Sequence, residues 1–465
     1  MNHILKKLFC PLLMLLPFTV SAQCGQNCAW SGEQSAHHKV ETPYKGAITK
    51  QDIADNPQYY SHFTDGQLRL DLTFAGNGKE QNVYLSGLKA EPLWAGTRKR
   101  LVPEFEYGEY RLEVRDVSDN GLLYATGFNT LFQEWRTTDE AINTSTARAF
   151  NSSYRIPFPK HKVNVIIYER LREDGSYSRL ATFEIDPQDK LINREQENSF
   201  AVTPILDNGH PQNKVDIVFI AEGYTSAEME KFRENVRKHV GYLFDIEPYK
   251  SRKDDFNIWA VESVSLESGT DIPHHDIWRE TAANSNFYTF RSDRYLTAEN
   301  QTLVCKLCSN APCDAMYVIV NTEKYGGGGI FNFYGLGMSD HRTTPMVFVH
   351  EFGHSFAGLA DEYFYDSDDT YLEMYNTAVE PWEPNVTSLV EFEKKWKDML
   401  PAGTQIPTVA VEGKPQVLGV YEGAGYMTKG LYRPVDNCRM RSNEAPGFCP
   451  VCQRAINRMI DYFTK

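Results

Sequence analysis

The spacing of apolar residues changes once along this chain, and the change predicts two regions of different architecture. From about residue 63 to residue 186, apolar and polar residues alternate, as in residues 68–74, which is typical of strands that bury one face. After Lys214 the alternation ends, and residues 215–221 form a continuous apolar stretch. With 465 residues, the chain also exceeds the roughly 250–300 residues at which a single core usually divides. We therefore expect a multidomain fold.

The first region is predicted to be an N-terminal antiparallel β-sandwich domain over residues 23–190. Residues 110–114, 163–168 and 180–185 repeat the alternating pattern between turn residues. We find no convincing helical stretch among them, which favours a sandwich of antiparallel sheets. A polar stretch, residues 191–208, is predicted to link this domain to the next.

The second region, residues 209–465, is predicted to be an α/β domain. Thr225 and Ser226 are suited to cap a helix that ends near residue 244. The apolar runs predict strands at residues 215–221, 256–264 and 315–321.

The N-terminus has the features of a secretory signal peptide. Lys6 and Lys7 precede an apolar run, residues 8–20, which ends in Ser21-Ala22. We expect cleavage after Ala22, so that residues 1–22 are removed and the protein is secreted, periplasmic or at the cell surface. No later segment approaches the ~18 consecutive apolar residues of a membrane span, so no transmembrane span is expected after cleavage.

The net charge argues against one class of partner. The chain has 48 Lys+Arg and 62 Asp+Glu, a formal charge of -14, which would repel a phosphate backbone. We therefore expect no nucleic-acid partner, and the oligomeric state is left open.

Eight cysteines remain after the predicted cleavage, an even number that favours disulfides in an exported protein. The C-x2-C spacing within two pairs is also that of structural zinc sites, so metal binding stays open as the less favoured alternative. These cysteines are Cys24, Cys28, Cys305, Cys308, Cys313, Cys438, Cys449 and Cys452.

A helix with a defined beginning and end is predicted at residues 345–357. Thr344 is suited to the N-cap and Pro345 to the first helical position, where its missing N–H is not needed. Gly358 is suited to end the helix.

This helix carries the sequence His350-Glu351-Phe352-Gly353-His354. Residues four apart lie on one helix face, so both histidines can bind one metal ion. Glu351 is offset from them and is predicted to act as the general base on a water molecule. The pattern therefore predicts a catalytic zinc site.

A hydrolytic zinc site needs a third protein ligand and an open position. Two carboxylates follow the helix, and a short return of the chain can bring one of them to the metal. Asp361 is preferred as that ligand because small neighbours permit close approach of its backbone, and Glu362 and more distant acids remain alternatives.

Three segments together resemble the bacterial IgA peptidase family of zinc metallopeptidases. They are residues 350–363, the run Tyr325-Gly326-Gly327-Gly328-Gly329, and Cys438-Arg439-Met440. The resemblance covers about residues 209–465, and the preceding β-domain resembles the N-terminal module of such enzymes. It implies a zincin-like catalytic domain similar to metzincins, although Asp361 lies one residue later than the metzincin ligand.

The glycine run and Met440 gain a role from this resemblance, and a few other residues are weaker candidates. Gly327, Gly328 and Gly329 are expected to lie along the cleft and contact the substrate backbone. Met440 is a candidate for the methionine turn below the metal, and Tyr432, or alternatively Tyr426, is a candidate donor to the oxyanion. The acidic run Asp366-Ser367-Asp368-Asp369 is a weaker candidate for binding calcium.

The combined expectation is an exported zinc metalloendopeptidase that cleaves host or extracellular proteins, with immunoglobulin A as a candidate substrate. One alternative is a surface or periplasmic binding protein whose zincin domain is vestigial, which the intact Glu351 disfavours. Another is a zinc hydrolase that acts on a non-peptide amide, such as a peptidoglycan cross-link.

Overall fold

The computed structural model describes residues 50–196, 200–364 and 374–465. The predicted signal peptide, Cys24, Cys28 and the calcium candidate at residues 366–369 lie outside the described residues. All the described residues belong to one compact unit, so both predicted regions pack together.

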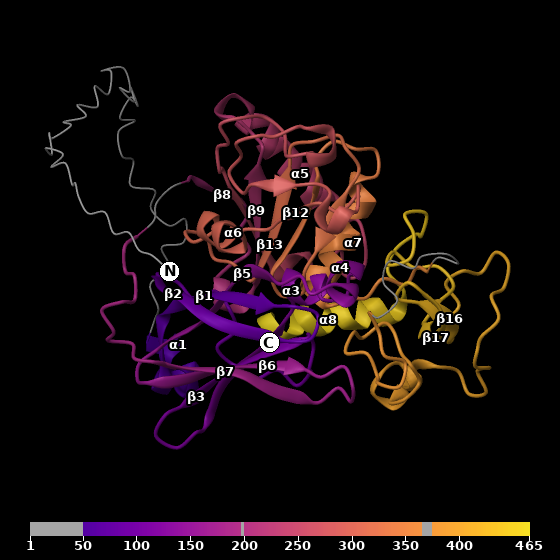
Figure 1. The fold of residues 1–465 in the computed structure, drawn as a ribbon, viewed down its shortest axis with the longest axis horizontal. Helices are drawn as coiled ribbons and strands as arrows, with labels where there is room; N and C mark the ends of the chain where they lie inside the picture. Colours follow the sequence, from indigo (N-terminus) through magenta and orange to yellow (C-terminus); the bar gives the residue numbers. More distant parts are fainter. Residues whose placement is uncertain (1–49, 197–199, 365–373) are drawn as a thin grey trace, which may run out of the picture. The chain divides into compact units, whose positions relative to one another are not determined.

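The N-terminal region contains two antiparallel sheets (Figure 1), which confirms its predicted strands. The three-stranded sheet has the order β2-β1-β5, with β1 Phe63–Gly76, β2 Gln81–Glu91 and β5 Arg148–Pro159. The four-stranded sheet has the order β4-β3-β6-β7, with β3 Tyr110–Asp116, β4 Leu122–Phe128, β6 Val163–Arg170 and β7 Tyr177–Ile185.

Four short helices in this region were not expected from the sequence. They are α1 Lys50–Asp55, α2 Pro57–His62, α3 Leu131–Trp135 and α4 Asp139–Asn143. Each has five or six residues, too few to show the 3.6-residue period. Helix α3 begins where the Thr130 hydroxyl accepts from the Gln133 amide at 3.0 Å, a standard N-cap.

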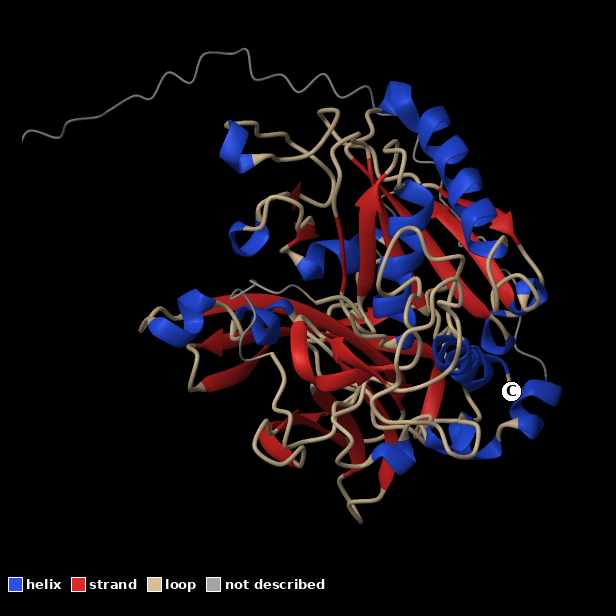
Figure 2. Ribbon diagram, turned by 90° about the vertical axis from the view of Figure 1, so that its right-hand side faces the viewer, coloured by secondary structure: helices blue, strands red, loops and turns tan. Residues whose placement is uncertain are grey.

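The second region is built on a six-stranded sheet (Figure 2). Four parallel strands lie in the centre, and the edge strands β14 and β8 are antiparallel to their neighbours. In spatial order the strands are β14 Gly327–Gly329, β15 Tyr334–Met338, β13 Ala315–Val320, β9 Val215–Glu222, β10 Phe256–Val261 and β8 Val202–Leu206. Because β8 pairs with β10, the end of the predicted linker is part of this sheet and not a free connection.

The two faces of the six-stranded sheet pack against different cores. Val218 and Ile220 of β9 join a core shared with the N-terminal sheets, whereas Ile217 and Phe219 join a core formed with helices. Those helices are α5 Met229–Phe244, α7 Thr344–Ala357 and α8 Pro450–Thr464. The Thr225–Glu228 capping box begins the helical segment that leads into α5, which confirms the predicted helix.

The remaining α-helix and strands are short. They are α6 Gln301–Leu307, β11 Ser285–Asn286, β12 Thr297–Ala298, β16 Tyr421–Ala424 and β17 Met427–Arg433.

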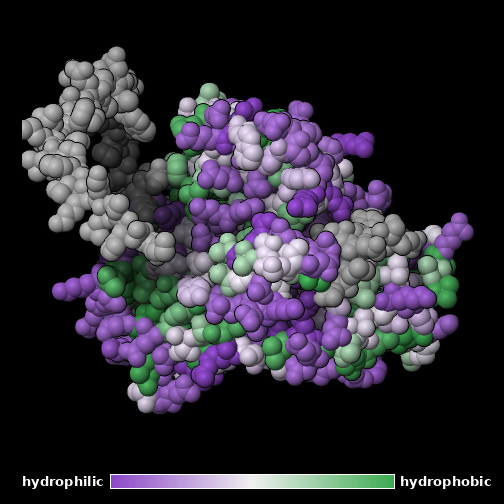
Figure 3. Space-filling view, in the orientation of Figure 1, coloured by the Kyte–Doolittle hydropathy of each residue, from purple (hydrophilic) through white to green (hydrophobic). Residues whose placement is uncertain are grey.

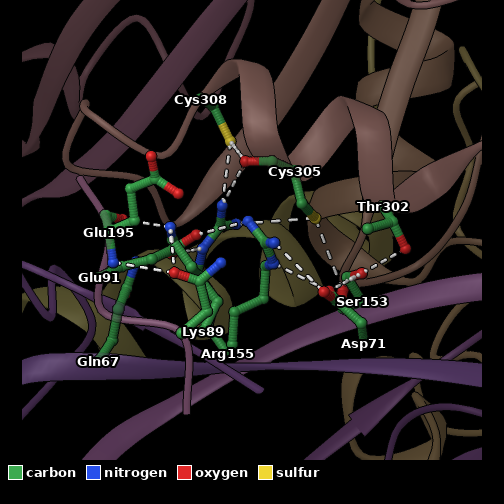
Figure 4. Close-up of polar contacts among 12 residues, drawn as sticks. Gln67, Asp71, Lys89, Glu91, Ser153, Arg155, Glu195, Thr302, Cys305 and Cys308 are labelled. Carbon is green, nitrogen blue, oxygen red and sulfur yellow. Dashed lines mark hydrogen bonds and ion pairs between the residues drawn. The ribbon is translucent and has the colours of Figure 1, made fainter. Parts of the chain in front are cut away.

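A buried polar network joins the N-terminal sheet to α6 (Figure 4). The Arg155 guanidinium on β5 donates to Glu91 at 2.7 Å and to the carbonyl of Cys305 at 2.9 Å. Arg69 reaches the same Glu91 carboxylate at 2.9 Å. The two regions are therefore joined by charged contacts as well as by the shared apolar core.

The six cysteines of the described residues are free thiols, so these residues contain none of the predicted disulfides. They lie in two groups of three, one at residues 305–313 and one at residues 438–452.

Among the described residues, no helix is both long and apolar enough to cross a membrane. On the face shown in Figure 3, hydrophilic side chains cover most of the described surface and apolar ones lie in small groups.

Candidate active site

Helix α7 is positioned by its two ends. It begins one residue earlier than predicted, because Thr343 and not Thr344 is the N-cap and the Thr344 hydroxyl donates instead to the Met338 carbonyl at 3.3 Å. Gly358 ends the helix in the left-handed conformation, with φ of 62°. A β-carbon there would also lie 2.8 Å from the Trp382 ring, so glycine is needed for both conformation and space.

Three side chains converge beside this helix. The Nε2 atoms of His350 and His354 lie 3.0 Å apart. They lie 3.0 Å and 3.2 Å, respectively, from one oxygen, Oδ1 of Asp361. All three are largely buried, with side chains 9–16 % exposed. The structure thus brings together the three residues predicted as metal ligands.

The hydrogen bonds of both imidazoles show that this arrangement suits a cation. Nδ1 of His350 lies 3.0 Å from the carbonyl oxygen of Arg439, and Nδ1 of His354 lies 2.5 Å from that of Leu359. A carbonyl only accepts, so both Nδ1 atoms carry a proton, and the Nε2 atoms are the ring nitrogens left to bind a metal ion through their lone pairs. Two lone pairs and a carboxylate oxygen facing one another fit a metal ion, whose neighbouring ligand atoms would be about 3.3 Å apart for zinc.

The two neighbouring carboxylates have different surroundings. The other oxygen of Asp361, Oδ2, accepts a short hydrogen bond from the Tyr426 hydroxyl. Glu362 accepts from the Asn385 side chain at 2.9 Å and lies 3.3 Å from the sulfur of Cys452. The geometry favours Asp361 as the third ligand, because Glu362 is held by other partners.

The side chain of Glu351, on helix α7, packs against the edge strand β14. A β-carbon on Gly327 would lie 3.0 Å from its Oε1, so this carboxylate is packed against the glycine strand. Burial raises the pKa of Glu351 above the usual range of a glutamate, which suits a general base acting near neutral pH.

The glycines of β14 are required by packing within the protein. A β-carbon on Gly329 would lie 2.5 Å from the Glu351 carbonyl oxygen, and one on Gly328 would lie 2.8 Å from that of Leu296. The amide of Gly327 donates to the Arg294 carbonyl at 3.3 Å. The structure therefore gives these residues a role that the sequence analysis did not foresee, in addition to their predicted place along the cleft.

These groups line one cleft of about 720 Å³. Its lining includes all three glycines of β14, the two histidines, Glu351 and Asp361. The N-terminal region also contributes Asn129, Thr130, Gln133 and Glu134.

Sequence reasoning missed the contribution of the N-terminal region. Glu134 accepts from the Tyr295 hydroxyl at 2.6 Å, and burial raises the pKa of its carboxyl to about 7. Helix α3 is too short to be recognised by periodicity, so only tertiary packing reveals that Glu134 lines the cleft.

Met440 lies below the histidine helix. It is fully buried, and a β-carbon on Gly353 would lie 3.0 Å from its sulfur. Its neighbour Arg439 supplies the carbonyl that orients His350. The structure thus places Met440 against the helix that carries both histidines, and its role as a methionine turn stays a prediction.

The two tyrosine candidates differ in position. Tyr426 lines the cleft and donates to Asp361. Tyr432 lies on β17, where its backbone pairs with Thr387, and it is outside the cleft lining that the described residues form. The structure therefore favours Tyr426 over Tyr432, which the sequence analysis had preferred, as the tyrosine that can meet a substrate.

Comparison with known families agrees with this geometry. The family model described as IgA Peptidase M64 matches residues 203–414 and 409–460, and the one described as Peptidase M64 N-terminus matches residues 58–180. A comparison with curated proteins gave no match. The first family model spans more than half of the chain and contains the three converging residues and Glu351. The chain therefore belongs to the IgA peptidase M64 family of metallopeptidases.

Proposed function

We propose that this protein is an exported zinc metalloendopeptidase that cleaves extracellular or host proteins. The observation that carries the proposal is the convergence of two Nε2 lone pairs and a carboxylate oxygen, from His350, His354 and Asp361, beside Glu351 in an open cleft. Export rests on the charged and apolar segments of residues 1–22.

Zinc held by these three residues would lower the pKa of a water molecule and polarise a peptide carbonyl. Glu351 takes a proton from the attacking water and transfers it to the leaving nitrogen. Its raised pKa suits this exchange, because the carboxylate must first accept the proton and then release it. Tyr426, through its hydrogen bond, holds the second oxygen of Asp361.

An extended substrate would lie along β14. All three glycines of this edge strand line the cleft, but the backbone of Gly327 already pairs with Arg294 and Leu296. We therefore expect Gly328 and Gly329 to make the main-chain contacts, with residues of α3 on the opposite side.

A screen of cleavage products tests this proposal. Purified protein would be incubated with a mixture of extracellular proteins that includes immunoglobulin A, and new amino termini would be identified by mass spectrometry. We expect cleavage that a chelator abolishes and added zinc restores.

Two other results would favour the alternatives. Tight binding of a protein or glycan without any new amino terminus would support the vestigial binding protein. Release of amines from peptidoglycan, but not from proteins, would support the amide hydrolase.

A further inference from the structure

A second group of metal-binding side chains lies beyond the active site. Glu362, Cys438, Cys449 and Cys452 are all fully buried, and one ligand atom from each lies within 4.8 Å of all the others. They come from the loop after α7, the segment before Met440 and the start of α8. Apart from the active-site triad, the described residues contain no other such group of three or more.

Backbone amides around this group donate hydrogen bonds to the cysteine sulfurs. The amide of Cys449 donates to Sγ of Cys438 at 3.3 Å, and the amide of Cys452 donates to Sγ of Cys449 at 3.5 Å. Cys449 is also the N-cap of α8, where the helix dipole favours negative charge. Both features stabilise thiolates, the form of cysteine that binds metal.

The carboxylate of Glu362 has one oxygen without a hydrogen-bond partner. Oε1 accepts from Asn385 at 2.9 Å and lies 3.3 Å from Sγ of Cys452, whereas Oε2 is buried without a hydrogen-bond partner. A buried polar atom left without a partner is costly, and a carboxylate with one oxygen beside the sulfurs and the other without a partner is a suitable metal ligand.

We propose that Glu362, Cys438, Cys449 and Cys452 bind a second, structural zinc ion. Three thiolates and a carboxylate supply four ligands, which is the closed set of a structural zinc site with no open position. Binding releases the three thiol protons to solvent. The charges of Arg433 and Arg439 act on Glu362 and Cys438 and offset part of the negative charge that remains.

A disulfide explains the same group less well. Three cysteines are an odd number, so one disulfide would leave a buried thiol. A disulfide between Cys438 and Cys452, whose sulfurs lie 3.7 Å apart, would also leave Oε2 of Glu362 without a partner. Zinc satisfies all four side chains at once.

The proposed ion would hold together the parts that support the active site. Glu362 follows the ligand Asp361, and its amide donates to the Met440 carbonyl at 2.9 Å. Cys438 precedes Arg439, whose carbonyl orients His350. Cys449 and Cys452 connect both segments to α8. The role is therefore one of positioning and not of catalysis.

Metal analysis of the purified full chain tests the inference separately from the proposed function. We expect two zinc ions per wild-type chain and one in the His350→Ala/His354→Ala variant, which lacks the active-site ligands. In that variant, cobalt in place of zinc should give the near-ultraviolet charge-transfer absorption of thiolate ligands. Cys313→Ser, in the other cysteine group, is the matched control and should keep both ions.

A second measurement does not depend on a variant that folds. Wild-type protein would be unfolded with a chelator and without reductant, alkylated and mapped by mass spectrometry. We expect Cys438, Cys449 and Cys452 all to be alkylated. A disulfide that includes any of them, or a folded double-histidine variant without zinc or the cobalt absorption, would overturn the inference.

Discussion

At the scale of single residues, we assign Glu351 a role separate from that of the predicted metal ligands. Glu351 lies between the two histidines in the sequence of α7, and its side chain packs against Gly327 of β14. Burial raises its pKa, and we expect its role as base to be separable from metal binding.

The first prediction concerns Glu351→Gln. The amide keeps the shape of the side chain but cannot accept the proton, so kcat on a cleaved protein should fall by about 10² to 10⁴-fold. Zinc content, measured by metal analysis, should be unchanged. Glu412→Gln is the control, because Glu412 is exposed and lies outside the cleft lining. Near wild-type turnover of Glu351→Gln would disprove its assignment as base.

The second prediction separates the third ligand from its supporting tyrosine. Asp361→Ala should abolish stoichiometric zinc at the active site, because two histidines alone bind zinc weakly. Tyr426→Phe removes the hydrogen bond to Asp361 and the 3.4 Å contact with the Tyr363 hydroxyl, and it should weaken zinc binding by about 10 to 100-fold. Competition with a zinc-binding dye measures both. If zinc affinity is equal in Asp361→Ala and wild type, another residue is the ligand.

At the scale of elements, helix α5 buries a titratable group against the sheet. His239 is fully buried, its Nδ1 lies 2.7 Å from the Asn235 carbonyl, and its ring packs near Phe219 and Phe348. Burial lowers the pKa of His239 to about 4. The folded state therefore resists the protonation that the unfolded chain undergoes near pH 6.5.

The third prediction follows from this lowered pKa. His239 contributes stability above pH 6.5, and that contribution is lost as pH falls towards 4, because the unfolded state binds the proton first. The decrease in unfolding free energy between pH 7 and pH 4.5 should be smaller by about 2 kcal/mol in His239→Leu than in wild type. Urea unfolding at both pH values measures this difference. Equal decreases in the two proteins would show that His239 is not responsible.

At the scale of the whole molecule, the N-terminal region is part of the structure that holds the cleft. It shares a core with the six-stranded sheet and supplies residues to the lining of the cleft. Arg155 of β5 contacts Glu91 of the neighbouring strand β2 and the carbonyl of Cys305 on α6 (Figure 4).

The fourth prediction compares two ion pairs of the same strand. Arg155→Ala removes a partner from Glu91, whose side chain is 1 % exposed, and should lower the free energy of unfolding by about 3 kcal/mol. Arg148→Ala removes an exposed pair with Glu140 and should cost at most about 1 kcal/mol. Chemical unfolding of both variants gives the comparison. Similar losses in the two variants would show that the buried pair contributes no more stability than the exposed one.

Much of the fold could be read from local patterns. The alternation in residues 63–186 predicted the antiparallel strands, and the caps Thr225 and Gly358 marked helix ends that the structure confirms. The missed features depend on distant contacts. Strand β8 lies in a polar stretch and forms only because β10 pairs with it, and helices of five or six residues carry no readable period.

The sequence by itself determined the class of protein and the chemistry of its main site. His350, Glu351 and His354 lie within one helical turn and a half, so their relative positions follow from helix geometry alone. Tertiary structure places Asp361, and not Glu362, beside the histidines, brings Tyr426 into the cleft lining and gathers three cysteines around Glu362. Neighbouring residues of a non-helical loop can point in different directions, and only packing against distant segments selects which one faces the histidines.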